Sequence, residues 1–186
     1  MTDSAEPFAW SDSDRVSRAP KNLRAATGAT WKPNSKAQIT ALGTYTVPEV
    51  IYEGNRGGGK TITLLMTYLA HVGKGYGPDW RGVIFRIKRD ALKDIINQSK
   101  KWFWLVYPGA VFNETSYTWK FPDGEMLTFA HFAVEDDYWG WHGQELPFIA
   151  WEELTSWADH SCFKIMMSCN RSSNPRVPRM IRATTN

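Results

Sequence analysis

One glycine-rich segment, residues 54–61 (GNRGGGKT), constrains the fold of this chain more than any other part of the sequence. It is too rich in glycine to continue a strand. The segment before it, residues 47–53 (VPEVIYE), is typical of a short strand, and residues 60–72 (KTITLLMTYLAHV) place apolar side chains at helical spacing. The pattern GxxxxGK[ST] between a strand and a helix predicts a phosphate-binding loop.

Each position of this loop has a physical role. Glycine adopts positive φ at little cost, so that consecutive backbone N–H groups can point at phosphate oxygens. The following helix adds free N–H groups and a dipole that favours anions. The Lys60 ammonium is expected to bridge the β- and γ-phosphates, and the Thr61 hydroxyl to bind Mg²⁺. The predicted nucleotide-binding residues of the loop are Gly54, Asn55, Arg56, Gly57, Gly58, Gly59, Lys60 and Thr61.

A pair of carboxylates forms the second half of the predicted site. Residues 147–151 (PFIAW) are typical of a buried strand, and Glu152 and Glu153 follow at its end. If this strand lies near that of the phosphate loop, both end at the same edge of the sheet. We assign Glu152 to the metal and Glu153 to the water that attacks the γ-phosphate. Aspartate is more usual at the metal position, and the alternative is an acid pair placed at a helix N-terminus by the dipole.

The rest of the chain alternates strand and helix patterns. This alternation predicts an α/β fold, with a mostly parallel central sheet, helices on both faces and a β-hairpin insertion around Pro-Asp-Gly. The loop and the acidic pair are about 90 residues apart in the sequence. This long separation predicts that, in the sheet, a further strand lies between the strand before the loop and the strand before the acidic pair. That strand order is the one found in motor-type P-loop ATPases. The predicted elements are a strand at 82–87, a helix at 90–105 capped by Asp90, two β-type runs within 116–132, a helix within 155–168 and a strand at 179–184.

Length and composition bound the class of protein. With 186 residues, 42% hydrophobic and 22% charged, the chain is expected to be globular rather than disordered. We expect a flexible N-terminal tail over residues 1–30 and one domain over 31–186. No apolar run reaches the roughly 20 residues that span a membrane, and the N-terminus lacks the apolar core of a secretory signal. Cys162 and Cys169 form neither a CxxC pair nor a disulfide framework, which favours a reducing cytoplasm.

Charge is distributed unevenly along the chain. Residues 81–104 carry seven Lys or Arg against two Asp, residues 123–160 carry nine Asp or Glu and no Lys or Arg, and residues 161–186 carry five Lys or Arg and no acid. The basic stretches suit a polyanion, or they are simply solvated faces. The residues that could contact DNA phosphates are Arg81, Arg86, Lys88, Arg89, Lys100 and Lys101. Alternatively, Arg86 or Lys88 faces the nucleotide.

Together, these motifs resemble the ATPase domain of bacteriophage large terminases, the motors that package viral DNA into proheads. The phosphate loop, the hairpin and residues 138–157 (YWGWHGQELPFIAWEELTSW) carry the resemblance, which covers residues 31–186. It implies an ATP- and Mg²⁺-dependent motor that moves double-stranded DNA in the host cytoplasm. It also implies a homo-oligomeric ring on a portal, a small terminase subunit as partner, and no membrane.

The resemblance implies roles for further residues. Gln38 in residues 31–38 (WKPNSKAQ) corresponds to the residue that hydrogen-bonds adenine, and Thr184, Thr185 and Asn186 to a coupling motif that senses the γ-phosphate. Arg56 is either an arginine finger or a plain phosphate or surface contact. The usual position of a finger from a neighbouring subunit has no Arg here, which leaves Arg171, Arg176 and Arg179 as unranked substitutes.

Two alternatives remain from the sequence. One is another P-loop DNA motor such as a helicase, which the hairpin and the acidic segment disfavour. The other is a truncated nucleotide- or DNA-binding module without turnover, because the chain ends at the coupling motif and no nuclease domain is expected within it.

Overall fold

The structure is a computed structural model that describes residues 31–44, 47–55, 57 and 59–185. The predicted tail over residues 1–30 lies outside the described residues. So do three predicted site residues, Arg56, Gly58 and Asn186.

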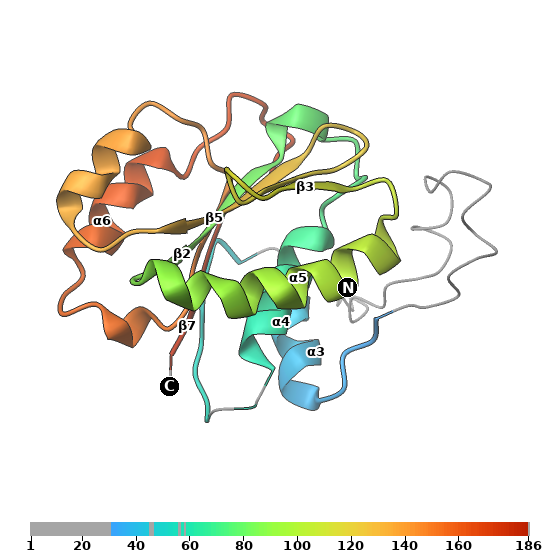
Figure 1. Cartoon of the computed structure of the whole chain (residues 1–186), viewed down its shortest axis with the longest axis horizontal. Coiled ribbons are helices and arrows are strands. Elements are labelled where there is room, and N and C mark those ends of the chain that lie inside the picture. The colour runs from blue at the N-terminus through green and yellow to red at the C-terminus, as the bar shows by residue number, and fades with distance from the viewer. Residues whose placement is uncertain (1–30, 45–46, 56, 58, 186) are drawn as a thin grey trace, which may run out of the picture.

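A seven-stranded sheet runs through the molecule in the order β1-β7-β6-β2-β5-β4-β3 (Figure 1). The five neighbouring strands β1, β7, β6, β2 and β5 are parallel, whereas β4 pairs antiparallel with β5 and with β3. The predicted mostly parallel sheet is therefore confirmed, and the further strand predicted between those of the loop and the acidic pair is β7. The strands are β1 (Glu49–Tyr52), β2 (Arg81–Arg86), β3 (Val111–Asn113), β4 (Thr118–Lys120), β5 (Met126–His131), β6 (Phe148–Trp151) and β7 (Met180–Thr184).

Within the described residues, four α-helices accompany the sheet, and short 3₁₀ turns connect them to the strands. The helices are α3 (Lys36–Gly43), α4 (Lys60–Leu69), α5 (Leu92–Val106) and α6 (Ser161–Met166). The 3₁₀ turns are η1 (Gly77–Asp79), η2 (Arg89–Ala91), η3 (Glu135–Gly140), η4 (Leu154–Ser156) and η5 (Met167–Cys169).

Two sequence predictions about helices were wrong in detail. Asp90 does not cap α5, because the chain first makes the 3₁₀ turn η2 and the cap residue is Ala91, which has no side-chain acceptor. The helix predicted within residues 155–168 is short, since η4 and an irregular stretch precede α6.

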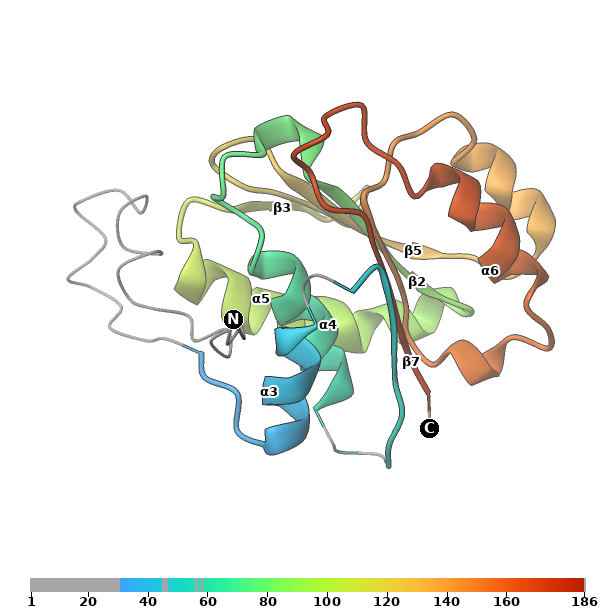
Figure 2. The ribbon, with the colours of Figure 1, turned by 180° about the vertical axis from the view of Figure 1, so that it is seen from behind.

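The pleat of the sheet divides the apolar side chains into two cores. Ile84 and Phe148 face α4 and α5, whereas Val83 and Ile149 face η3 and α6 on the other side (Figures 1 and 2). This alternation follows from the two-residue period of a strand. Both faces are covered, which explains why β6 is apolar at every position.

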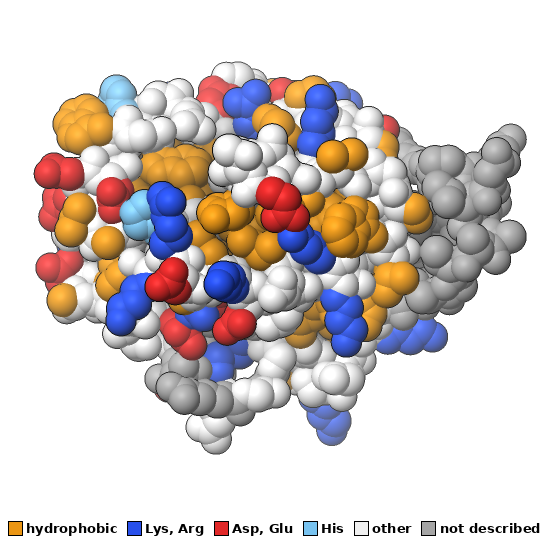
Figure 3. Space-filling view, viewed as in Figure 1, with side chains coloured by type: hydrophobic (Ala, Val, Ile, Leu, Met, Phe, Trp, Pro, Cys, Tyr) orange, Lys and Arg blue, Asp and Glu red, His pale blue; other side chains and the backbone are white. Residues whose placement is uncertain are grey.

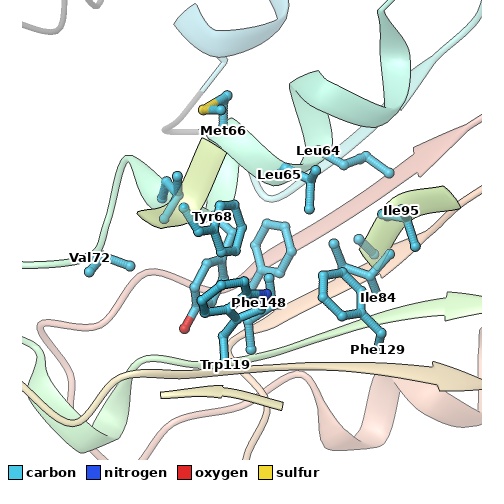
Figure 4. Packing of buried hydrophobic residues seen from close by; sticks show 14 of the residues in the cluster. Leu64, Leu65, Met66, Tyr68, Val72, Ile84, Ile95, Trp119, Phe129 and Phe148 are labelled. Atoms are coloured by element: carbon cyan, nitrogen blue, oxygen red, sulfur yellow. The ribbon is translucent and has the colours of Figure 1, made fainter. Parts of the chain in front are cut away.

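The core beneath α4 is rich in aromatic rings. Tyr68 of α4 lies beside Phe148 of β6 (Figure 4), with ring centroids 5.3 Å apart. Tyr68 also stacks on Trp80, with ring centroids 5.4 Å apart. Each buried side chain of this size stabilises the fold by roughly 1.5–3 kcal/mol. The packing anchors α4, and with it the loop that precedes α4, on the sheet. No helix among the described residues is both long and apolar enough to cross a membrane.

Candidate nucleotide-binding site

The predicted site residues that the structure describes meet at one edge of the sheet because four parallel strands end there. Tyr52, the last residue of β1, pairs with Thr184 of β7, and Trp151, the last of β6, lies between Phe85 of β2 and Ala183 of β7. The residues that follow these strands must therefore emerge side by side. Carboxyl ends of parallel strands are where α/β proteins bind ligands.

The glycine-rich loop joins β1 to α4 at this edge. Gly57 and Gly59 have φ of +82° and +71°, in the left-handed region that side chains other than glycine rarely adopt, and Gly59 is the cap residue of α4. The Lys60 ammonium donates hydrogen bonds to the carbonyls of Gly54 (2.5 Å) and Asn55 (2.8 Å). The side chain of Lys60, the first residue of α4, thus folds back and places its positive charge against the backbone of the loop.

Thr61 and Glu152 are brought into direct contact across the two motifs. The Thr61 hydroxyl donates to Oε1 of Glu152, whose side chain is almost fully buried. Burial raises the pKa of Glu152, and the neighbouring Glu153 charge adds to the rise, whereas the Thr61 hydrogen bond and Arg86 oppose it. A hydroxyl and a carboxylate side by side are oxygen donors of the kind that Mg²⁺ takes.

Arg86 holds both carboxylates of the acidic pair. Its Nε lies 3.0 Å from Oε2 of Glu152, and its Nη1 donates to Oε2 of Glu153 at 2.5 Å. The sequence left Arg86 open between DNA and the nucleotide; the structure places it between the two glutamates. The signal for this contact was its position at the carboxyl end of β2, the strand that pairs with β6.

Glu153 has an unusual backbone conformation for a residue that is not glycine. Its φ of 58° and ψ of 56° are left-handed, at a cost of about 1 kcal/mol or more. Its N–H donates to the Thr184 hydroxyl (2.9 Å), and its carbonyl accepts from Ser156 (2.8 Å). The adjoining N–H of Thr185 donates to the carbonyl of Tyr52 at 3.1 Å. Thr184 and Thr185 therefore tie β7 to the acidic pair and to β1.

Gln38 lies at the predicted site, although its amide contacts protein. Its Oε1 accepts from the N–H of Asn34 (2.9 Å), and its Nε2 donates to the carbonyl of Gly59 (3.4 Å). Gln38 is buried, and its helix α3 is capped by Ser35, whose hydroxyl accepts from the Gln38 N–H. Beside it, a cavity of about 460 Å³ opens between α3, β1 and the loop, lined among others by Gln38, Tyr52 and Asn55.

The arginines named as substitute fingers lie away from this edge within the chain. Arg171 donates to the carbonyl of Gly143 (2.9 Å). Arg176 and Arg179 precede β7 and so lie at its amino end, opposite the loop. The structure therefore does not bring them to the acidic pair of their own chain.

Arg182 is a buried charge that the sequence analysis did not single out. It donates to the carbonyls of Thr44 and Pro48, both at 3.1 Å, and so ties β7 to the end of α3 and to the start of β1. Burial lowers the pKa of this guanidinium. The signal available in the sequence was an arginine among the apolar residues Met180, Ile181 and Ala183 of β7.

Comparisons with known proteins concern the fold. No family model and no curated protein matches the sequence. Among solved structures, the large terminase from the thermophilic bacteriophage D6E matches with a TM-score of 0.62 and 18% identity, over 83% of this chain and 39% of that one. The large terminase of bacteriophage HK97 matches with a TM-score of 0.61 and 14% identity, over 84% and 33%.

This chain has a fold similar to that of phage large terminases. At these identities the likeness establishes the fold alone, and the chain spans well under half of either terminase. The D6E enzyme was also solved in complex with ADP and with ATP-gamma-S, and these structures match with TM-scores of 0.56 and 0.55.

Proposed function

We propose that this chain is a Mg²⁺-dependent P-loop ATPase whose hydrolysis powers double-stranded DNA translocation during viral genome packaging. The observation that carries the proposal is the contact of Thr61 with Glu152 at the sheet edge where Arg86 also reaches Glu153. A glycine-rich loop that opens a helix, and a carboxylate pair that meets it from another strand, together suit a nucleoside triphosphate and its metal.

The loop would bind the triphosphate. Its backbone N–H groups and the start of α4 favour anionic oxygens, and the Lys60 ammonium, now on the Gly54 and Asn55 carbonyls, is near enough to exchange them for phosphate. Gly57 and Gly59, both at positive φ, supply the turn, and Gly58 between them would lie against the phosphates. Arg56 would stabilise the charge on the transferring phosphate, or simply contact it.

Thr61 and Glu152 would hold Mg²⁺. The fit rests on their direct contact and on Oε2 of Glu152, a buried oxygen that accepts no hydrogen bond from the described residues and has Arg86 as its ionic partner. Bound there, Mg²⁺ would neutralise charge on the β- and γ-phosphates. Glu152 takes this role rather than Glu153 because it is the buried member of the pair and touches the loop helix.

Glu153 would orient the attacking water and take its proton. Its side chain is 40% exposed, so water reaches it, and the left-handed backbone turns it out of the line of β6. Arg86 acts as a positioning residue for this carboxylate. The coupling residues Thr184, Thr185 and Asn186 would report the state of the γ-phosphate, since Thr184 binds the Glu153 backbone.

Gln38 would read the adenine base, and its contact with the Gly59 carbonyl gives it a second role in fixing the loop. We propose a single ATPase domain over residues 31–186 and expect no nuclease activity from these residues. The motor would act as a homo-oligomeric ring on a portal, together with a small terminase subunit.

Double-stranded DNA would be bound through phosphates without reading of sequence. The face formed around α5 carries Lys and Arg side chains interspersed with Asp and Glu (Figure 3), and Lys100 already pairs with Glu114. A DNA contact there would therefore be moderate in strength and salt-dependent.

ATP hydrolysis by the full chain, with and without double-stranded DNA, tests the proposal. We expect Mg²⁺-dependent turnover that is abolished in Lys60→Ala and Glu153→Ala, with ATP binding kept in Glu153→Ala. Lys120→Ala changes an exposed lysine of β4, away from the loop and outside the basic stretches, so it is the matched control and should behave as the parent. Mg-ATP binding without turnover would favour the binding-module alternative, and no binding at all would overturn the phosphate-loop assignment.

A further inference from the structure

A second cavity, of about 650 Å³, opens at the opposite edge of the sheet from the proposed ATPase site. It lies where β1 and β7 begin, between the segment that follows α4 and the loop that precedes β7. Figure 2 shows these two segments close together, and Asn174 bridges them by donating to Asp79 (2.8 Å). The cavity is thus part of the fold and separate from the glycine-rich loop.

A buried histidine forms the floor of this cavity. His71 is 7% exposed, and its Nδ1 lies 3.1 Å from the carbonyl of Thr67. Because a carbonyl only accepts, Nδ1 carries the proton and Nε2 presents a lone pair. Burial lowers the pKa of His71 to about 4, with further lowering by Arg182 and Lys74, so the ring stays neutral at pH 7. No partner for Nε2 occurs among the described residues.

Positive charge lies at the rim. Arg176 and Arg179 line the cavity, and neither guanidinium forms a hydrogen bond or ion pair within the described part of the chain. Glu49 lines the same cavity and adds one acceptor. The two arginines are donors that suit a phosphate group.

The aromatic ring of Tyr76 also lines the cavity. This ring lies 19° from parallel to that of His71, the centroids 6.4 Å apart, and Trp80 supports both from behind. Rings held in this way offer a surface on which a flat heterocycle can stack.

We propose that this cavity binds a nucleotide unit: a base that donates an N–H to Nε2 of His71 and packs on Tyr76, with its phosphate on Arg176 and Arg179. The acceptor at the floor suits a ligand with a donor, and the two guanidinium groups, unpaired among the described residues, suit an anion. An adenine nucleotide has both. The unit comes either from a free nucleotide or from a single nucleic-acid strand, which present the same base and phosphate.

Histidine-selective ¹⁵N NMR of the full chain, titrated with AMP, tests the site. The chain has four histidines, which makes the Nε2 resonance of His71 assignable by a His71→Asn variant. We expect this resonance to move on AMP addition in the parent and equally in Lys60→Ala. The double variant Arg176→Ala/Arg179→Ala should bind AMP at least tenfold more weakly. Arg171→Ala should bind AMP as the parent does, because the Arg171 guanidinium donates to the Gly143 carbonyl outside the cavity.

Two further ligands resolve the recognition. Adenosine and ribose 5-phosphate should each bind at least tenfold more weakly than AMP, because one lacks the phosphate and the other the base. Displacement of AMP by oligo-dA would identify a strand as the source, and no displacement a free nucleotide. An unmoved His71 resonance, a response lost in Lys60→Ala, or unchanged affinity in the double arginine variant would overturn the proposal.

Discussion

Replacing Arg86 by Met should destabilise the fold in a pH-dependent way. The change removes the cation that lies 3.0 Å from the buried Glu152 carboxylate. A buried carboxylate that loses its ionic partner avoids the free-energy cost of a buried charge by taking up a proton. The loss in free energy of unfolding is therefore limited to the free energy of protonating the carboxylate. For a glutamate with an unfolded-state pKa of 4.5, that cost at pH 7 is about 3.4 kcal/mol, at about 1.4 kcal/mol per pH unit. Glu153 adds little because its side chain is 40% exposed.

The sign of the pH dependence follows from the proton count. In the variant the folded state holds a proton that the unfolded chain lacks above pH 4.5, so its stability falls as pH rises. We expect a loss of about 3 kcal/mol at pH 7 and about 2 kcal/mol at pH 6, measured by urea unfolding of parent and variant at both values.

Lys100→Met is the matched control. Lys100 pairs with Glu114 at 2.5 Å, but Glu114 is 68% exposed, so this loss should stay within about 1 kcal/mol and be independent of pH. An Arg86→Met loss no larger than that of Lys100→Met, or equal at pH 6 and pH 7, would refute the reasoning.

Three other variants test separate parts of the structure. His71 has a pKa of about 4 in the folded state, below 6.5 in the unfolded chain, so the unfolded chain takes up the proton first. The free energy of unfolding should therefore fall by about 3 kcal/mol as the pH falls from 6.5 to 4. His71→Asn should remove this pH dependence from acid unfolding curves. In Gly59→Ala, a Cβ would lie 2.4 Å from Nε2 of Gln38 at a φ of +71°, so ATP binding should weaken about tenfold by titration calorimetry. The same substitution made in a Gln38→Ala background should weaken ATP binding by a smaller factor, because the clash is absent there. Thr184→Val leaves the Glu153 N–H without its acceptor; kcat should fall at least tenfold with KM for ATP within twofold, and a change confined to KM would argue against a coupling role.

Patterns local in sequence predicted much of this molecule. The loop between β1 and α4, the apolar run of β6 and the amphipathic pattern of α5 each depend on neighbours within a few residues. Glu152 and Glu153 were found in the same way, as carboxylates at a strand end. The sheet order was also predictable in part, since a long connection between two motif strands left room for β7.

What the sequence did not predict depends on contacts between distant segments. Arg86 reaches Glu153 across 67 positions, and Arg182 reaches Thr44 across 138, and nothing in either local pattern specifies the partner. The failed cap at Asp90 has a different cause: the 3₁₀ turn η2 delays the helix by two residues, and local capping preference does not reveal it.

The most direct test of the central claim is calorimetric binding of ATP-gamma-S to the full chain in Mg²⁺ and in EDTA, beside Lys60→Ala and Thr61→Val. The account predicts binding to the parent that tightens at least tenfold with Mg²⁺, loss of that gain in Thr61→Val, and loss of binding in Lys60→Ala. Binding that is indifferent to Mg²⁺ and unchanged in Lys60→Ala would contradict a nucleotide site built from the loop, Thr61 and Glu152.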